Sequence, residues 1–419
     1  MLTRGYYITP NGASSLINFK YCGANLSPVY KYILSPLANF FVELTPTWVA
    51  PNVITTFGLI WMIVSYIQIW YYCPNFVEGL ISEELVPRHI FLFNGLAMLI
   101  YQTLDNMDGK QARRTGSSSA MGLLFDHGCD AFNCILISAN LRCAMGVQPS
   151  DLWQCAAIEF SSFGIFFMAT WEEYHTHKLI QTFFNCPTEG LIVSAMISFT
   201  SFAYGVNYWH QSTILNNTMK FMFPDRLTQI IMEKIGGSNV RNLDFVCITL
   251  ILIFTIEVFM KLSTVIRNTK SLSSIRSLLP LVTLITISTL VVRHNPDLFL
   301  QNPRTCLHLS CLLFCEIDTQ LLLDHMTKQQ YQPFRLSLLP SLCFFLIPKE
   351  DAVSQYHFLL AYTIAMAMYM AMKVRLVFWE MCNVMRIWFF DIVTPFHGVE
   401  DDQSLSDVSA GTGDMMKCQ

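Results

Sequence analysis

Charged side chains are scarce in this chain, since Asp, Glu, Lys and Arg make up only 13% of its 419 residues. A soluble domain usually carries about a quarter. Apolar residues reach 53%, and the mean hydropathy is +0.41. A basic stripe with interleaved aromatic residues, the pattern of a nucleic-acid-binding surface, is also missing. These features predict an all-α polytopic membrane protein and no nucleic-acid partner.

The sequence also lacks cysteine pairs at metal-binding spacing. None of its 14 cysteines forms a Cys-x-x-Cys pair. Most lie in apolar runs, where cysteine packs as a small hydrophobic residue. No apolar run occurs before about residue 30, so we expect no cleavable signal peptide.

Ten apolar segments come near the length of about 20 residues that a membrane span needs. They cover residues 52–72, 89–104, 122–145, 152–171, 189–204, 244–262, 278–292, 306–323, 334–347 and 356–379. Residues 28–41 have scattered apolar and aromatic side chains, which predicts an amphipathic helix lying along the membrane interface. The expected architecture is therefore about ten transmembrane helices preceded by one interfacial helix.

Four parts are expected along the chain. Residues 1–51 form a cytosolic N-terminus with the interfacial helix, and residues 52–204 form the catalytic transmembrane core. Residues 205–381 add further transmembrane helices. Residues 382–419 form a cytosolic tail, expected to be disordered because it becomes rich in Ser, Asp and Gly without periodicity. A cytosolic N-terminus places Lys110, Arg113 and Arg114 in the cytosol, in agreement with the positive-inside bias.

Residues 105–130 contain four carboxylates at the ends of two predicted spans. Asp105 and Asp108 close the second span, and Asp126 and Asp130 open the third. Spacings of three and four residues place each pair on one helix face. Acids this close repel one another unless a cation neutralises them, and hard divalent cations prefer oxygen ligands. Two ions about 3.5–4 Å apart could be shared by the four acids and clamp a pyrophosphate.

Neighbouring residues extend this metal site toward phosphate chemistry. Arg113 is a planar, bidentate donor suited to phosphate oxygens. Gly109 and Gly122 carry no side chain where helices and a ligand must approach closely. Together these residues predict a phosphoryl-transfer centre. The alternative is a surface loop in which the acids cap helices and pair with Lys110, Arg113 and Arg114.

The stretch resembles the signature of the CDP-alcohol phosphotransferase family. That signature is Asp-x-x-Asp-Gly-x-x-Ala-Arg, eight residues, Gly, three residues, Asp, three residues, Asp, and residues 105–130 fill every fixed place. Residues 48–52, 171–176 and 185–190 are similar to the eukaryotic choline/ethanolamine phosphotransferases. The resemblance implies transfer from CDP-choline or CDP-ethanolamine to the 3-hydroxyl of diacylglycerol, with release of CMP. Which head group is used stays open.

The resemblance also implies a setting and residue roles. The protein would be an integral membrane protein of the endoplasmic reticulum or Golgi, embedded in membrane lipids with its site facing the cytosol. A homodimer is compatible with the family. Mg²⁺ or Mn²⁺, as two ions, would be held by Asp105, Asp108 and Asp126, with Asp130 a ligand or the proton acceptor. The implied substrate-binding residues are Asn52, Gly109, Ala112, Arg113 and Gly122.

Two residues compete for the role of catalytic base. A carboxylate that binds a divalent ion is a poor proton acceptor. His127, next to Asp126, is better matched to neutral pH. In relatives of this subfamily the corresponding histidine has that role, so we favour His127 over Asp130. The alternative is that His127 only orients a neighbouring aspartate.

Two rival functions and one unassigned pair of acids stay open at this point. A CDP-diacylglycerol-dependent phosphatidyltransferase acting on a soluble alcohol would keep the motif, although the ten-span frame argues against it. A cation-coupled transporter would show inverted repeats and carboxylates near the bilayer midplane, whereas the four motif acids cluster at one surface and no repeat is visible. Glu316 and Asp318 lie deep in the eighth span, where charge is costly, so they should face protein as a dimer seam or a lumen-side polar cluster.

Overall fold

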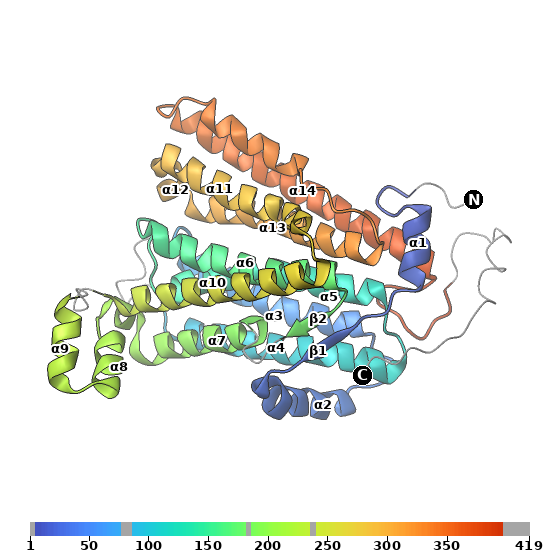
Figure 1. The fold of residues 1–419 in the computed structure, drawn as a ribbon, viewed down its shortest axis with the longest axis horizontal. Coiled ribbons are helices and arrows are strands. Elements are labelled where there is room, and N and C mark those ends of the chain that lie inside the picture. Colours follow the sequence, from blue (N-terminus) through green and yellow to red (C-terminus); the bar gives the residue numbers. More distant parts are fainter. Residues whose placement is uncertain (1–4, 77–85, 182–185, 235–239, 397–419) are drawn as a thin grey trace.

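The computed structural model describes residues 5–76, 86–181, 186–234 and 240–396, and helices dominate it (Figure 1). The N-terminal elements are α1 (Pro10–Ile17), β1 (Gly23–Asn25), the π-helical turn η1 (Tyr30–Leu34) and α2 (Ser35–Leu44). The next are α3 (Pro51–Tyr72), α4 (His89–Thr115), α5 (Ala120–Ala144), α6 (Leu152–Thr176), β2 (Leu179–Gln181), α7 (Cys186–Tyr204), η2 (Val206–His210), α8 (Ile214–Met222) and α9 (Asp225–Lys234). The last are α10 (Asn242–Thr269), η4 (Leu272–Leu278), α11 (Leu279–His294), α12 (Pro296–Gln301), α13 (Pro303–Met326), η5 (Leu336–Phe345) and α14 (Ala352–Met385).

Seven helices of the described part are long and apolar enough to cross a membrane, which makes the chain an integral membrane protein. They are α3, α5, α6, α10, η4 with α11, α13 and α14. The predicted count of about ten is not confirmed. Helix α4 carries the charges of the motif, and α7 packs against α4. The predicted span 334–347 contains instead the ten-residue 3-10 helix η5, with Pro340 inside it. At about 2 Å per residue, η5 is shorter than a bilayer core of about 30 Å.

The predicted interfacial helix over residues 28–41 corresponds to η1 and α2, which together are helical from Tyr30 to Leu44. The buried side chains of Ala38 and Val42 pack with Ile54 of α3 and Met107 of α4. This helix therefore rests on the helix that carries the first two motif aspartates. Its position at the membrane surface stays a prediction.

Helix α13 lies at the centre of the bundle. Inside the protein, 67% of its apolar stretch is buried, against 17% for α10. It packs against α5, α6, α11 and α14. The helices that follow residue 205 thus share one core with those that precede it.

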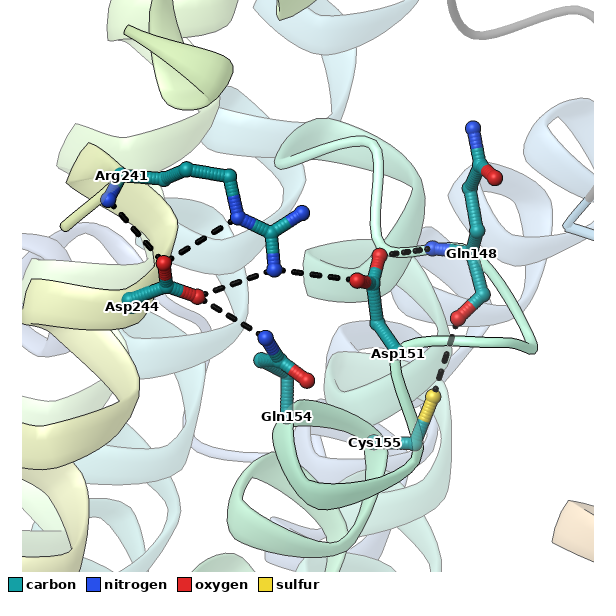
Figure 2. Close-up of polar contacts among 6 residues, drawn as sticks. All are labelled: Gln148, Asp151, Gln154, Cys155, Arg241 and Asp244. Atoms are coloured by element: carbon teal, nitrogen blue, oxygen red, sulfur yellow. Dashed lines mark hydrogen bonds and ion pairs between the residues drawn. The ribbon is translucent and has the colours of Figure 1, made fainter. Parts of the chain in front are cut away.

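A polar network joins the starts of α6 and α10 at the end of the bundle near α8 and α9 (Figures 1 and 2). The guanidinium of Arg241 donates to Asp244 and to Asp151, each at 3.0 Å. Gln154 of α6 donates to the same Asp244 carboxylate at 2.8 Å. Carboxylates with this many donors hold the two helices together, at the opposite end of α5 from the motif.

Helix α1 and the C-terminal end of α14 lie at the other end of the bundle (Figure 1). The Glu380 carboxylate of α14 accepts hydrogen bonds from the backbone N–H groups of Tyr6, Tyr7 and Ile8. Residues 18–28, which we call the N-terminal strap, then cross to η1. Within the strap, β1 pairs in parallel with β2, and Ser27 donates to Glu189.

Residues 382–396, the start of the tail that the sequence predicts to be disordered, belong to the described part of the chain. Helix α14 continues to Met385, because the residues of its last turn still bury apolar side chains such as Met381. The chain then turns back so that the Phe389 ring meets Phe125 of α5, with ring centroids 4.8 Å apart. Residues 397–419 lie outside the described part of the chain.

Candidate active site

The motif lies on α4 and α5 and on the short turn that joins them. Helix α4 continues through Thr115 and ends at Gly116, whose φ of +68° is the left-handed conformation that glycine adopts freely. The N–H of Ser117 closes the end by donating to the Ala112 carbonyl. Ser119 caps α5 by accepting from the N–H of Gly122 at 3.1 Å. Between the predicted spans 89–104 and 122–145, only residues 116–119 are not helical, and all four aspartates lie on α4 or α5.

Three of these aspartates converge. Asp105 of α4 and Asp126 and Asp130 of α5 each offer a carboxylate oxygen, and the three oxygens lie within 4.8 Å of one another. The Tyr101 hydroxyl donates to Asp130. Asp126 Oδ1 is buried and has no hydrogen-bond partner. A buried oxygen without a partner is costly, and a divalent cation coordinated by all three acids would satisfy it, so these residues fit a metal ion.

Asp108 has partners of its own. It is buried, and its carboxylate accepts hydrogen bonds from the Thr55 hydroxyl and from the backbone N–H of Gly109. It does not belong to the group of three converging oxygens. Its assignment as a metal ligand stays a prediction.

The predicted substrate-binding residues lie at the start of α3, near the end of α4 and at the start of α5. The Arg113 guanidinium is exposed and lies over Gly109, 3.5 Å from where a Cβ would stand. A Cβ on Gly122 would stand 3.6 Å from Asn52 Oδ1. The amide nitrogen of Asn52 donates to the Phe389 carbonyl at 2.9 Å. Ala112 lies one turn after Asp108, half-buried. Their binding roles stay predictions.

His127 projects from α5 toward α6 and α13. Its Nε2 lies 2.9 Å from the Thr170 hydroxyl and 2.9 Å from the Asp318 carboxylate. The Phe166 ring covers the imidazole, with centroids 4.5 Å apart. Asp318 is fully buried. Sequence reasoning flagged Asp318 as a costly charge in an apolar span, but it could not name a partner 191 residues away.

Glu316 likewise finds its partners inside the chain. Its carboxylate accepts from Arg335, from Ser337 and from Lys373 of α14 at 3.2 Å. Neither the proposed dimer seam nor a lumen-side cluster is needed to explain this acid or Asp318. Sequence reasoning also missed Tyr101, Thr55 and Thr170, because hydroxyl side chains in apolar helices carry no pattern that marks them.

The N-terminal strap passes close to the aspartates. Burial raises the pKa of the Tyr21 hydroxyl above its ordinary value, and the Glu173 and Asp126 carboxylates raise it further. The ring of Phe19 meets His325 edge-on at 5.9 Å, and His325 Nε2 lies 4.0 Å from Glu173. The strap thus brings an aromatic hydroxyl within electrostatic reach of the candidate metal site.

An apolar cavity of about 460 Å³ lies between α3, α5, α13 and α14. Gly128 and Cys129, which follow His127 directly, form part of its wall. The other wall residues are almost all aliphatic or aromatic, with Thr319 and Lys373 as the polar exceptions. A cavity of this character accommodates hydrocarbon next to the residues of the motif.

The chain is similar to a described protein family and to several known proteins. The family model described as CDP-alcohol phosphatidyltransferase matches residues 48–223. Choline/ethanolaminephosphotransferase 2 of Arabidopsis thaliana is 34% identical over 67% of this chain and 68% of the relative. An uncharacterized member of the same class from Dictyostelium discoideum is 30% identical over 80% of this chain and 84% of the relative. Human ethanolaminephosphotransferase 1 is 27% identical over 88% of this chain and 89% of the relative.

Proposed function

Because the chain belongs to the CDP-alcohol phosphatidyltransferase family, we propose that it is a diacylglycerol choline/ethanolamine phosphotransferase. It transfers phosphocholine or phosphoethanolamine from the CDP-alcohol to diacylglycerol and releases CMP. The relatives from Arabidopsis and human, which are named as choline/ethanolamine and ethanolamine phosphotransferases, support this substrate class. The observation that carries the proposal is the convergence of Asp105, Asp126 and Asp130 around an unsatisfied buried oxygen.

In this proposal the donor binds at the ends of α4 and α5. Asp105, Asp126 and Asp130, with Asp108 beside them, would hold Mg²⁺ or Mn²⁺, as two ions. When bound, these cations neutralise the diphosphate and stabilise the charge that develops on the departing CMP. Arg113 contacts a phosphate oxygen. The remaining substrate residues, Asn52, Gly109, Ala112 and Gly122, leave room for the cytidine and orient it.

The acceptor reaches the site from the bilayer. The apolar cavity between α3, α5, α13 and α14 suits acyl chains, and its wall includes Phe125 and Gly128, which flank Asp126 and His127 in the sequence. Diacylglycerol seated there would bring its 3-hydroxyl toward the motif. His127 takes the proton of that hydroxyl, in preference to Asp130, whose carboxylate already accepts from Tyr101.

The finer setting is also part of the proposal. The motif faces the cytosol, where the soluble CDP-alcohol is found, and the protein resides in the endoplasmic reticulum or Golgi. A homodimer stays a prediction that follows from the family.

A reconstitution assay tests the function. The purified full-length protein, in vesicles containing diacylglycerol, is given CDP-choline or CDP-ethanolamine, and the lipid product is measured with Mg²⁺, with Mn²⁺ and with a chelator. We expect product with at least one donor, none in chelator, and a loss of at least about 10²-fold for Asp105→Ala. Product only from CDP-diacylglycerol and a soluble alcohol would overturn the assignment, as would full activity in chelator.

A further inference from the structure

Asp318 has one hydrogen-bond partner side chain in the described part of the chain, and that side chain is His127. The residue is fully buried in α13, with Oδ2 at 2.9 Å from His127 Nε2. Its other oxygen, Oδ1, is buried and unpartnered. A carboxylate enclosed in a membrane protein is expensive unless it is paired, so its position against an imidazole calls for a reason.

The hydrogen bonds around the ring determine which nitrogen carries the hydrogen. The Thr170 hydroxyl lies 2.9 Å from Nε2 and 3.3 Å from the Phe166 carbonyl, and it accepts from Nε2 when its own hydrogen is donated to that carbonyl. The Asp318 carboxylate is also an acceptor. Nε2 therefore faces two acceptors and must be the protonated nitrogen. Nδ1 keeps its lone pair, and the described residues offer it no hydrogen bond.

We propose that Asp318 is a positioning residue for the transfer reaction: it holds the His127 ring in the Nε2–H form, so that Nδ1 receives the proton of the lipid hydroxyl. This inference rests on the proposed function. As the hydroxyl O–H bond breaks, its hydrogen moves to Nδ1 and its oxygen bonds to the β-phosphorus of the CDP-alcohol. The bond from that phosphorus to the CMP oxygen breaks, and its electron pair leaves with CMP. The positive charge then on the ring lies against the Asp318 carboxylate, as in hydrolase triads.

The same helix provides a matched control. Glu316 is buried two residues earlier in α13, but the hydrogen bonds that its carboxylate accepts come from Arg335, Ser337 and Lys373 and not from His127. Replacing either acid by its amide removes one buried charge from α13. Only the Asp318 change alters the acceptor at Nε2, so a general effect of lost charge and a specific effect on the ring can be separated.

The experiment is a double-mutant cycle on the full-length protein in diacylglycerol vesicles, with a labelled donor. For Asp318→Asn we expect kcat to fall on the order of 10²-fold, with the KM for CDP-alcohol unchanged within about twofold. In a His127→Ala background the same substitution should have no further effect. Glu316→Gln should lower the unfolding temperature. If it also lowers kcat, it should lower kcat by the same factor in the His127→Ala background.

Two results would overturn the proposal: an unaltered kcat for Asp318→Asn, or a loss that multiplies with that of His127→Ala. If Asp318→Asn does not fold, Thr170→Val tests the same arrangement, since it removes the other acceptor. Its loss of kcat should vanish in the His127→Ala background, and a multiplying loss would contradict the assigned tautomer. Failure of the proposed function looks different, because the unmodified protein would then give no lipid product with either donor.

Discussion

Replacing Asp126 by Asn should make the metal-free protein more stable while abolishing its activity. The three converging carboxylate oxygens lie within 4.8 Å of one another. Two unit charges at that distance repel by about 3.5 kcal/mol at an effective dielectric constant of about 20. Asp126 takes part in two of the three pairs. Because proton uptake relieves much of this repulsion, we expect a gain on the order of 1–2 kcal/mol when its charge is removed.

When a divalent cation is present, Asp126→Asn should be less stable than the unmodified protein. A ligand that binds only the folded protein stabilises it in proportion to the logarithm of its concentration over the dissociation constant. The unmodified protein should therefore unfold at a higher temperature in excess Mg²⁺ than in chelator. Asp126→Asn loses a ligand, so its unfolding temperature should respond much less.

Thermal unfolding of the purified full-length protein in detergent, followed by tryptophan fluorescence, measures both effects. Asp151→Asn is the matched control, since Asp151 pairs with Arg241 at the opposite end of the bundle. It should lower the unfolding temperature equally in chelator and in Mg²⁺. The cation site would be refuted if Asp126→Asn unfolded below the unmodified protein in chelator and both responded equally to Mg²⁺.

Three further perturbations test other parts of the structure. Ala371→Trp fills the apolar cavity, so the KM for diacylglycerol should rise at least several-fold, while the affinity for CDP-alcohol, measured by calorimetry, should stay the same. Equal effects on both substrates would contradict the assignment of the cavity to acyl chains. Truncation after Met385 removes the Phe389 carbonyl that orients Asn52 and should raise the KM for CDP-alcohol, whereas truncation after Phe396 should leave it unchanged. Identical kinetics for the two truncated proteins would exclude a role of the Phe389 carbonyl in substrate binding. Glu380→Gln weakens the hydrogen bonds to Tyr6–Ile8 by roughly 1 kcal/mol or more. Limited proteolysis should therefore cut the N-terminal segment faster than in the control Glu43→Gln, which changes an exposed residue. Equal rates would argue against the anchoring of the N-terminal segment by Glu380.

The spacing of the motif predicted two pairs of aspartates, each on one helix face, because helical periodicity determines which side chains share a face. Of the four acids expected to converge, the structure brings Asp105, Asp126 and Asp130 together, whereas Asp108 lies outside this group. The ends of the helices were harder to predict. Hydropathy places the end of a span where charges begin, yet α4 continues for three turns beyond residue 104. Helix α4 can continue through polar residues because neighbouring helices pack against it, and it ends at Gly116.

Contacts between distant segments could not be derived from the sequence. The partner of Asp318 depends on how α5 and α13 pack, and no local pattern encodes that. The short 3-10 helix η5 looked like a span because its composition is apolar, although Pro340 disfavours a regular α-helix there. The tail residues 386–396 looked disordered because their anchors, Phe389 and Phe390, pack on a helix more than 250 residues earlier.

The central place of α13 affects how shortened gene products are interpreted. A transcript ending near residue 223 would encode the whole stretch that matches the family model. It would lack α13 and α14, and with them one wall of the cavity and the carboxylate that contacts His127. Such an isoform would still be recognised as a family member by its sequence, but it would synthesise no lipid.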